Sequence, residues 1–155
     1  MKGVRSISVV SAIMTLVLLL ESCGEQACYD NTDPMMNSLL LESGTGVSVK
    51  ATSIVITGIT ATDTIEFVNA KTVSSFSLPL DPGNDVSTFY IVLDGITDTA
   101  VMNYTRHPHL VSDECGYTIV SELTDLSTTH NIIDTLIIEN KSVNLNGKTN
   151  LHLFY

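Results

Sequence analysis

A chain of 155 residues that is 44% hydrophobic and only 15% charged has enough apolar side chains for one compact core, which excludes a largely disordered protein. Its formal net charge of −10 argues against nucleic acid as a partner, because such a surface repels phosphates and the sequence has no basic patch to offset the repulsion. The acidic residues are scattered singly, which is typical of a solvated surface rather than a cation site.

The first 22 residues have the pattern of a secretory signal. Lys2 and Arg5 precede the uncharged stretch 7–20, as a positively charged segment precedes the apolar one in such signals. A helix of that length spans about 21 Å, less than the roughly 30 Å hydrocarbon core, so a permanent transmembrane helix is the weaker interpretation. We therefore predict a signal peptide over residues 1–22 and export of the chain.

The residues at the end of this signal predict how the exported chain is attached to a membrane. The run Leu20-Glu21-Ser22-Cys23 resembles the lipobox of bacterial lipoproteins, from which it departs at Glu21. The resemblance implies that the sulfur of Cys23 carries diacylglycerol and that its amine is acylated as well. Two or more acyl chains hold a protein stably at a membrane, whereas one anchors it marginally. Cys23 is the predicted lipidation site, and a buried or free Cys23 is the alternative.

Cys28 and Cys115 are the cysteines that remain once Cys23 is acylated. In an oxidising compartment two remaining thiols predict one disulfide. It would close a long loop, worth about 4 to 5 kcal/mol in the chain-entropy model, and would join the N-terminal leader to the domain. A zinc site is the rival interpretation, but two cysteines so far apart, without any C-x-x-C pair, are a weak zinc motif.

The chain after the signal divides into a leader and a strand-rich domain. Residues 23–46 contain many turn formers and are predicted to be a lipidated leader partly packed on the domain. Over residues 47–155, short runs of Val, Ile, Thr, Tyr and Phe alternate with Gly, Asn, Asp and Pro, and no stretch has a helical period. This spacing predicts an all-β domain, an antiparallel β-sandwich of about eight short strands, with a small β-barrel as the alternative. The expected strands are 47–57, 64–69, 73–80, 86–93, 99–106, 117–126, 132–139, 141–145 and 151–155.

Alternation within the strand 73–80 places Phe76, Leu78 and Leu80 on one face and Ser77 and Pro79 on the other. Pro79 has no N–H to donate to a neighbouring strand. We therefore expect this strand to lie at the edge of a sheet or to end at Pro79.

The stretch 104–117 concentrates the candidate chemistry of the chain. In an extended backbone His107 and His109 project to the same side, where Asp113 or Glu114 would be a third metal ligand. Pro108 instead favours a stiff loop over a central strand, and H-x-H without a third ligand at diagnostic spacing is a weak motif. A structured loop is the preferred interpretation. The alternative function is a metal-binding protein or a metal-dependent hydrolase that uses this segment.

Other catalytic chemistry has little support in the sequence. There is no G-x-S-x-G motif for a nucleophilic serine, and the paired aspartates Asp81 and Asp85 lie in a Pro-Gly turn whose spacing fits no calcium loop. The lack of Trp weakens the case for a glycan-stacking platform. We expect a non-catalytic protein without a cofactor.

A set of residues and segments forms a recognisable pattern: Tyr104, Arg106, His107, Pro108, Val111, Asp113, Glu114, Cys115, Gly116, the segments 28–31 and 130–134, and the closing NLHLFY. This pattern resembles a family of small uncharacterised lipoproteins from Bacteroidetes. The resemblance implies a cell-envelope lipoprotein without an assigned activity, a binding or structural accessory module whose partners are the membrane, through the lipid anchor, and an envelope protein or glycan. Gly24 lacks the Asp that retains many lipoproteins at the inner membrane, so the implied location is the outer membrane, on its periplasmic or surface face.

Such an origin would also predict a modification of three threonines. Periplasmic proteins of these bacteria are O-glycosylated where Asp precedes Ser or Thr and a small or aliphatic residue follows. Thr64, Thr99 and Thr135 occupy such motifs and are the candidate O-glycosylation sites. The alternative is that these Asp-Thr pairs simply begin strands.

Overall fold

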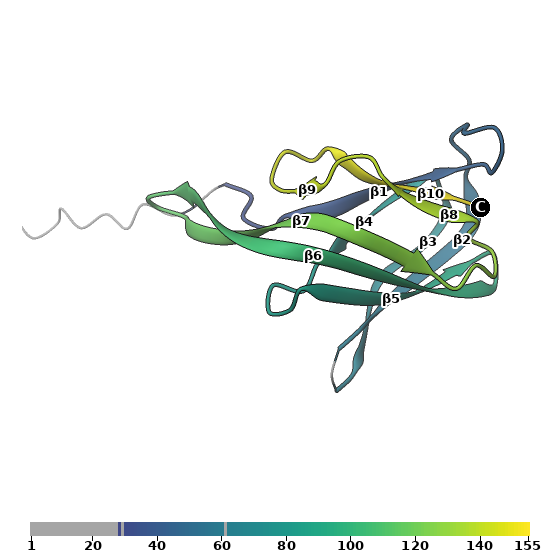
Figure 1. Ribbon diagram of the computed structural model, residues 1–155, viewed down its shortest axis with the longest axis horizontal. Helices are drawn as coiled ribbons and strands as arrows, with labels where there is room; N and C mark the ends of the chain where they lie inside the picture. The colour runs from purple at the N-terminus through teal and green to yellow at the C-terminus, as the bar shows by residue number, and fades with distance from the viewer. Residues whose placement is uncertain (1–27, 29, 61) are drawn as a thin grey trace, which may run out of the picture.

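The computed structural model describes residues 28, 30–60 and 62–155. Their strands form a four-stranded sheet, in the order β4-β1-β10-β8, and a six-stranded sheet, in the order β3-β2-β5-β6-β7-β9. The two sheets face each other (Figure 1), so the predicted β-sandwich is confirmed. The strands are β1 (Met35–Leu41), β2 (Ala51–Ile59), β3 (Thr64–Val73), β4 (Ser75–Pro79), β5 (Val86–Leu93), β6 (Ile96–Ser112), β7 (Gly116–Thr128), β8 (Thr135–Ile138), β9 (Ser142–Val143) and β10 (Thr149–Phe154).

Alternating apolar residues build the core between the two sheets. In β5, Phe89, Ile91 and Leu93 are buried, whereas the residues between them are more exposed. From the smaller sheet, Met36 and Leu40 of β1 face them with no exposed surface. Burial of each such side chain contributes roughly 1.5 to 3 kcal/mol, so the pattern of alternation decides which face of each strand turns inward.

Strand β1 extends the sandwich into the region predicted to be a leader. It lies between β4 and β10, and its pairing with β10 is parallel, whereas the other pairings of the described strands are antiparallel. A parallel pair needs a long connection, and here nearly the whole domain lies between the two strands. The sandwich therefore starts at Met35 rather than at residue 47, and it contains one parallel pair that the sequence did not indicate.

The expectation for Pro79 is confirmed on both counts. Strand β4 is an edge of the four-stranded sheet and ends at Pro79. Its partner β1 lies on one side only, with Pro79 opposite Met35.

The prediction that Pro108 lies in a stiff loop is wrong, because β6 continues through His107, Pro108 and His109 to Ser112. Strand β5 pairs with β6 only as far as Asn103. Beyond that point β6 pairs with β7 alone, so Pro108 occupies a stretch whose other side carries no described strand. A proline is tolerated at such a local edge because no ladder hydrogen bond is lost there.

The outer part of the β6–β7 hairpin thus projects from the sandwich as two strands. Figure 1 shows its tip at one end of the long axis and the C-terminus at the other end. We refer to residues 104–121 as the projecting hairpin. Its turn, between Ser112 and Gly116, brings Cys115 to the tip.

Candidate functional site

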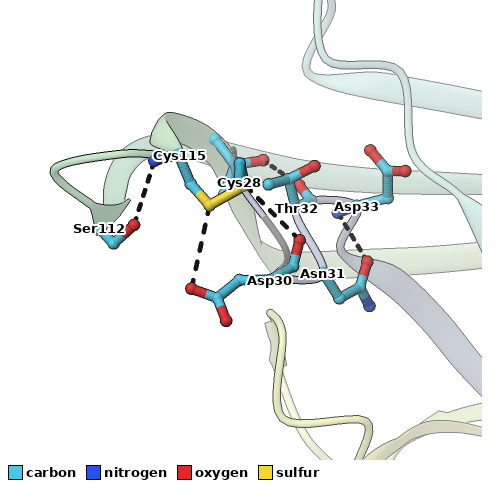
Figure 2. Close-up of a disulfide and its surroundings, with 8 residues drawn as sticks. Cys28, Asp30, Asn31, Thr32, Asp33, Ser112 and Cys115 are labelled. Atoms are coloured by element: carbon cyan, nitrogen blue, oxygen red, sulfur yellow. Dashed lines mark hydrogen bonds between the residues drawn. A yellow bond between two sulfur atoms is a disulfide. The ribbon is translucent and has the colours of Figure 1, made fainter. Parts of the chain in front are cut away.

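The predicted disulfide is present at the tip of the projecting hairpin. Cys28 and Cys115 are bonded, with their Cα atoms 4.8 Å apart and 87 positions apart in the sequence. Figure 2 shows the bridge joining the start of the described chain to the turn after β6. The Cys28–Cys115 prediction is confirmed.

Hydrogen bonds hold the chain segments on both sides of the bridge. In the turn, the N–H of Cys115 donates to Oγ of Ser112 at 3.1 Å (Figure 2). On the other side, the N–H of Asp33 donates to Oδ1 of Asn31 at 3.1 Å, and the hydroxyl of Thr118 on β7 donates to the carbonyl oxygen of Thr32 at 2.6 Å. Residues 30–34, which we call the strap, are therefore held along β7 before the chain enters β1.

The histidines of the projecting hairpin do not converge with its acids. His107 and His109 are exposed and lie on one face of β6, opposite Val120 and Thr118, as expected for an extended backbone. Nε2 of His107 is 3.3 Å from the hydroxyl of Thr105. Asp113 and Glu114 lie in the turn, and no group of three or more His, Cys, Asp or Glu in the described residues is arranged to hold a metal.

The other face of the projecting hairpin is apolar and open. Register places Leu110 opposite Tyr117 and Pro108 opposite Ile119, on the face that continues the core side of the sheet. Tyr117 is 73% exposed and Leu110 is 45% exposed, because the smaller sheet does not extend over them. The tip therefore presents an aromatic and aliphatic surface next to the disulfide.

The turn between β4 and β5, residues 81–85, is fixed by buried hydroxyl groups. The hydroxyl of Tyr104 donates to the carbonyl oxygen of Asp81 at 3.0 Å and lies 2.8 Å from Oγ of Ser87. Ser87 in turn accepts the N–H of Asp81 at 3.0 Å. Burial raises the pKa of Tyr104, so the phenol remains a neutral donor.

Charged groups hold the outer part of the same turn. Arg106 donates from Nε to Asp85 at 2.6 Å and from its Nη1 to the carbonyl oxygen of Pro82 at 2.7 Å. The side-chain amide of Asn84 and the N–H of Gly83 lower the pKa of Asp81. The turn is thereby a rigid wall beside the inner face of β5.

An apolar pocket lies between this turn and strands β2, β3 and β5. Its volume is about 270 Å³, and we call it the β3 pocket. The ring of Phe67 covers the backbone of Gly58 so closely that a Cβ atom there would overlap it, and it meets Phe89 edge-on at a centroid distance of 6.2 Å. The sequence alone did not indicate this pocket, because its walls come from four separate segments that only the tertiary fold joins.

Asp98 organises the loop that precedes β8. Its carboxylate accepts the N–H groups of Asn131, Ile132 and Ile133 at 2.7 to 2.8 Å and the hydroxyl of Thr129. Burial alone would raise the pKa of this carboxyl group, but the hydrogen bonds outweigh burial and lower the pKa to about 2. This loop explains why β8 comprises only Thr135–Ile138 of the expected strand 132–139.

The three glycosylation candidates lie in different surroundings. Thr64 and Thr135 are exposed, each at the first residue of its strand. Thr99 is half-buried within β6, after the fully buried Asp98, and its N–H donates to the hydroxyl of Thr129 at 2.9 Å. The folded domain therefore presents two of the three motifs at its surface.

The signal peptide and Cys23 lie outside the described residues. Among the residues that the structure describes, none belongs to a helix long and apolar enough to cross a membrane.

The family of unknown function DUF6452 matches over residues 53–155. The chain belongs to this family. The DUF6452 match includes Cys115, the whole β6–β7 hairpin and the residues that line the β3 pocket, but it begins after β1 and Cys28. No curated protein and no solved structure matches the chain. The predicted membership of an uncharacterised family is confirmed, and its description assigns no activity.

Proposed function

We propose that the chain is a lipid-anchored lipoprotein of the cell envelope, at the outer membrane, and acts as a non-catalytic binding or structural accessory module. The observation that carries the proposal is the position of the disulfide. It ties the first described residue, Cys28, to the tip of the projecting hairpin. A disulfide at this place also suits an exported protein, because such bridges persist in oxidising compartments.

The spacing between the two N-terminal cysteines gives the bridge a mechanical role. Cys28 is five positions after Cys23, a stretch that spans at most about 18 Å when fully extended. An acylated Cys23 would therefore hold the hairpin tip near the membrane surface. The bridge would transmit any pull on the anchor directly to the β6–β7 hairpin, and the opposite end of the sandwich would remain accessible to partners.

Three ionisable groups with shifted pKa values, Asp81, Asp98 and Tyr104, favour a structural role over catalysis. The hydrogen bonds of Asp98 fix the loop before β8, and those of Asp81 and Tyr104 fix the turn between β4 and β5. Each of these groups is thus engaged by backbone atoms of the fold. Perturbed pKa values are a mark of catalytic groups only where such structural partners do not account for them.

Metabolic labelling with an alkyne fatty acid tests the anchoring. The wild-type protein should be labelled and should sediment with outer membranes, and Cys23→Ala should lose both properties. Cys28→Ala is the matched control, because it removes a cysteine five positions away and breaks the disulfide but should remain labelled. Labelling that persists in Cys23→Ala would refute the proposal.

A further inference from the structure

Strand β3 is a long edge of the larger sheet. It comprises ten residues, Thr64–Val73, and most of them are exposed. On one side it pairs with β2, and on the other no strand of the described chain lies beside it. Its outward N–H and C=O groups can therefore pair with the backbone of another extended chain.

The β3 pocket lies directly beside this edge, on its inner face. Ile65 and Phe67 of β3 contribute one wall and Val86 of β5 another, with exposures of 48%, 39% and 44%. An extended chain that paired with β3 would direct alternate side chains toward this face. One such side chain would lie beside Ile65, at the mouth of the pocket.

A bulge in β3 fixes the pocket wall. Ile56 of β2 pairs with Val68, and the next residue, Thr57, pairs with Glu66, so Phe67 is the extra residue between them. Its ring turns over Gly58, where only glycine leaves room for it. Bulges re-aim a side chain in this way, and here the bulge directs an aromatic ring into the pocket.

Charge around the pocket defines the chemistry of the occupant. Asp63 and Glu66 are exposed near the start of β3, and Asp81 lies in the pocket lining with a lowered pKa. Lys71 is at the far end of the strand. A chain with positively charged side chains next to a large apolar one would complement this arrangement.

We propose that the β3 edge binds an extended basic peptide segment of a partner protein by strand addition, with one large apolar side chain in the β3 pocket. This inference deepens the proposed function, because it names the class of partner for the binding module. It requires no lipid anchor. The acylated protein in nanodiscs and the Cys23→Ala protein in buffer should therefore bind equally, which separates a failure of this inference from a failure of the anchoring proposal.

The test uses synthetic heptapeptides, Lys-Val-Lys-Phe-Lys-Val-Lys and the same peptide with a central Ala, titrated against the full mature chain by fluorescence anisotropy. The Phe peptide should bind at least about tenfold more tightly than the Ala peptide, because only its ring fills the pocket. N-methylation of alternate residues on one edge of the peptide should abolish binding, and methylation on the other edge should be tolerated. Such a difference reports backbone pairing rather than general attraction to an acidic protein.

Protein variants locate the site. Val86→Lys and Glu66→Lys should each weaken binding about tenfold, while Ile137→Lys, on β8 at an edge of the four-stranded sheet, should leave it unchanged. Circular dichroism melting shows whether each variant remains folded. Equal binding of the Phe and Ala peptides, equal binding of both N-methylated peptides, no binding up to 1 mM, or sedimentation showing that a second copy occupies the β3 edge would each overturn the inference.

Discussion

Asp98 is a buried carboxylate whose negative charge is balanced by hydrogen bonds alone. It has no exposed surface, and three backbone N–H groups and one hydroxyl donate to it. A buried charge without such donors would be strongly destabilising. The residue therefore links the start of β6 to the loop before β8, which lies in the other sheet.

Asp98→Asn should lower the free energy of unfolding by roughly 2 to 4 kcal/mol at pH 7, because the amide cannot accept all of these hydrogen bonds. The folded-state pKa of about 2 lies below 3.8, the ordinary pKa of an aspartate side chain. The charge therefore contributes stability that is complete above pH 3.8 and is lost as the pH falls through about 2. Urea unfolding at several pH values should show that the difference in unfolding free energy between the wild type and the variant becomes smaller from pH 5 to pH 2.

Asp125→Asn is the matched control for this experiment, since Asp125 is exposed on β7. The unfolding free energy of this variant should stay within about 0.5 kcal/mol of the wild-type value at every pH. A difference between wild type and Asp98→Asn that stayed constant down to pH 2 would show that the carboxylate is not the source of the stability.

Gly58 and Phe67 form a second residue-level pair. Gly58→Ala should destabilise the protein by roughly 1 to 3 kcal/mol, because the added Cβ overlaps the ring of Phe67 and the ring must move. In a Phe67→Ala background the same change should be neutral or slightly stabilising, since glycine weakens a strand. Denaturant unfolding of all four proteins gives the coupling energy, and strictly additive effects would contradict the contact.

At the scale of elements, the projecting hairpin depends on its disulfide more than the sandwich does. Beyond Asn103 of β6 and Ser121 of β7, the two strands pair only with each other. An isolated two-stranded hairpin is marginally stable in water. The strap and the disulfide are therefore needed to keep this element ordered.

The Cys28→Ser/Cys115→Ser variant should lose roughly 4 to 5 kcal/mol of unfolding free energy, because the unfolded chain regains the entropy of a long loop. Hydrogen exchange through local opening should become faster in residues 104–119, whereas the amides of β2 and β5 should exchange faster only as far as the loss in global unfolding free energy requires. Reduction of the wild type should reproduce this pattern. Exchange in residues 104–119 that speeds up no more than exchange in β2 and β5 would show instead that the bridge gives the hairpin no local stability.

The sequence predicted those elements whose signal is local. Runs of β-forming residues indicated β5 and β7, alternation indicated β4, and the missing N–H of Pro79 indicated the end of an edge strand. The missing N–H of Pro108 led to a wrong prediction. The sequence does not show that β5 stops pairing with β6 before Pro108, which leaves that side of β6 open. Strand β1 was missed because it lies among turn formers, and its partner β10 is at the other end of the chain.

The candidate sites likewise divide into those that the sequence predicted and those that it did not. The cysteine count and the expected compartment predicted the Cys28–Cys115 bridge, because two candidates leave one pairing. The hydrogen bonds of Asp98 join residues more than thirty positions apart in the sequence, and the β3 pocket joins four separate segments between residues 58 and 89, so no local pattern predicts either site. Such sites arise from packing and become visible only in the folded chain.

At the scale of the whole molecule, anchorage and fold together imply an orientation. The hairpin tip and the C-terminus lie at opposite ends of the long axis (Figure 1). The tip carries the disulfide and the exposed Tyr117 and Leu110, whereas Tyr155 ends the chain at the other end. If Cys23 is acylated, the tip faces the lipid and the C-terminal end points away from it.

Single tryptophans can measure this orientation, because the chain contains none. In vesicles with nitroxide-labelled headgroups, Tyr117→Trp should be quenched strongly and Tyr155→Trp weakly, since at most about 18 Å of chain separates Cys23 from the bridge. In the Cys23→Ala background both tryptophans should escape quenching. Opening the disulfide should weaken the quenching of Tyr117→Trp, because the anchor would then pull on the strap and β1 instead of the hairpin. Stronger quenching at position 155 than at 117 would mean that the domain lies with its C-terminal end against the membrane.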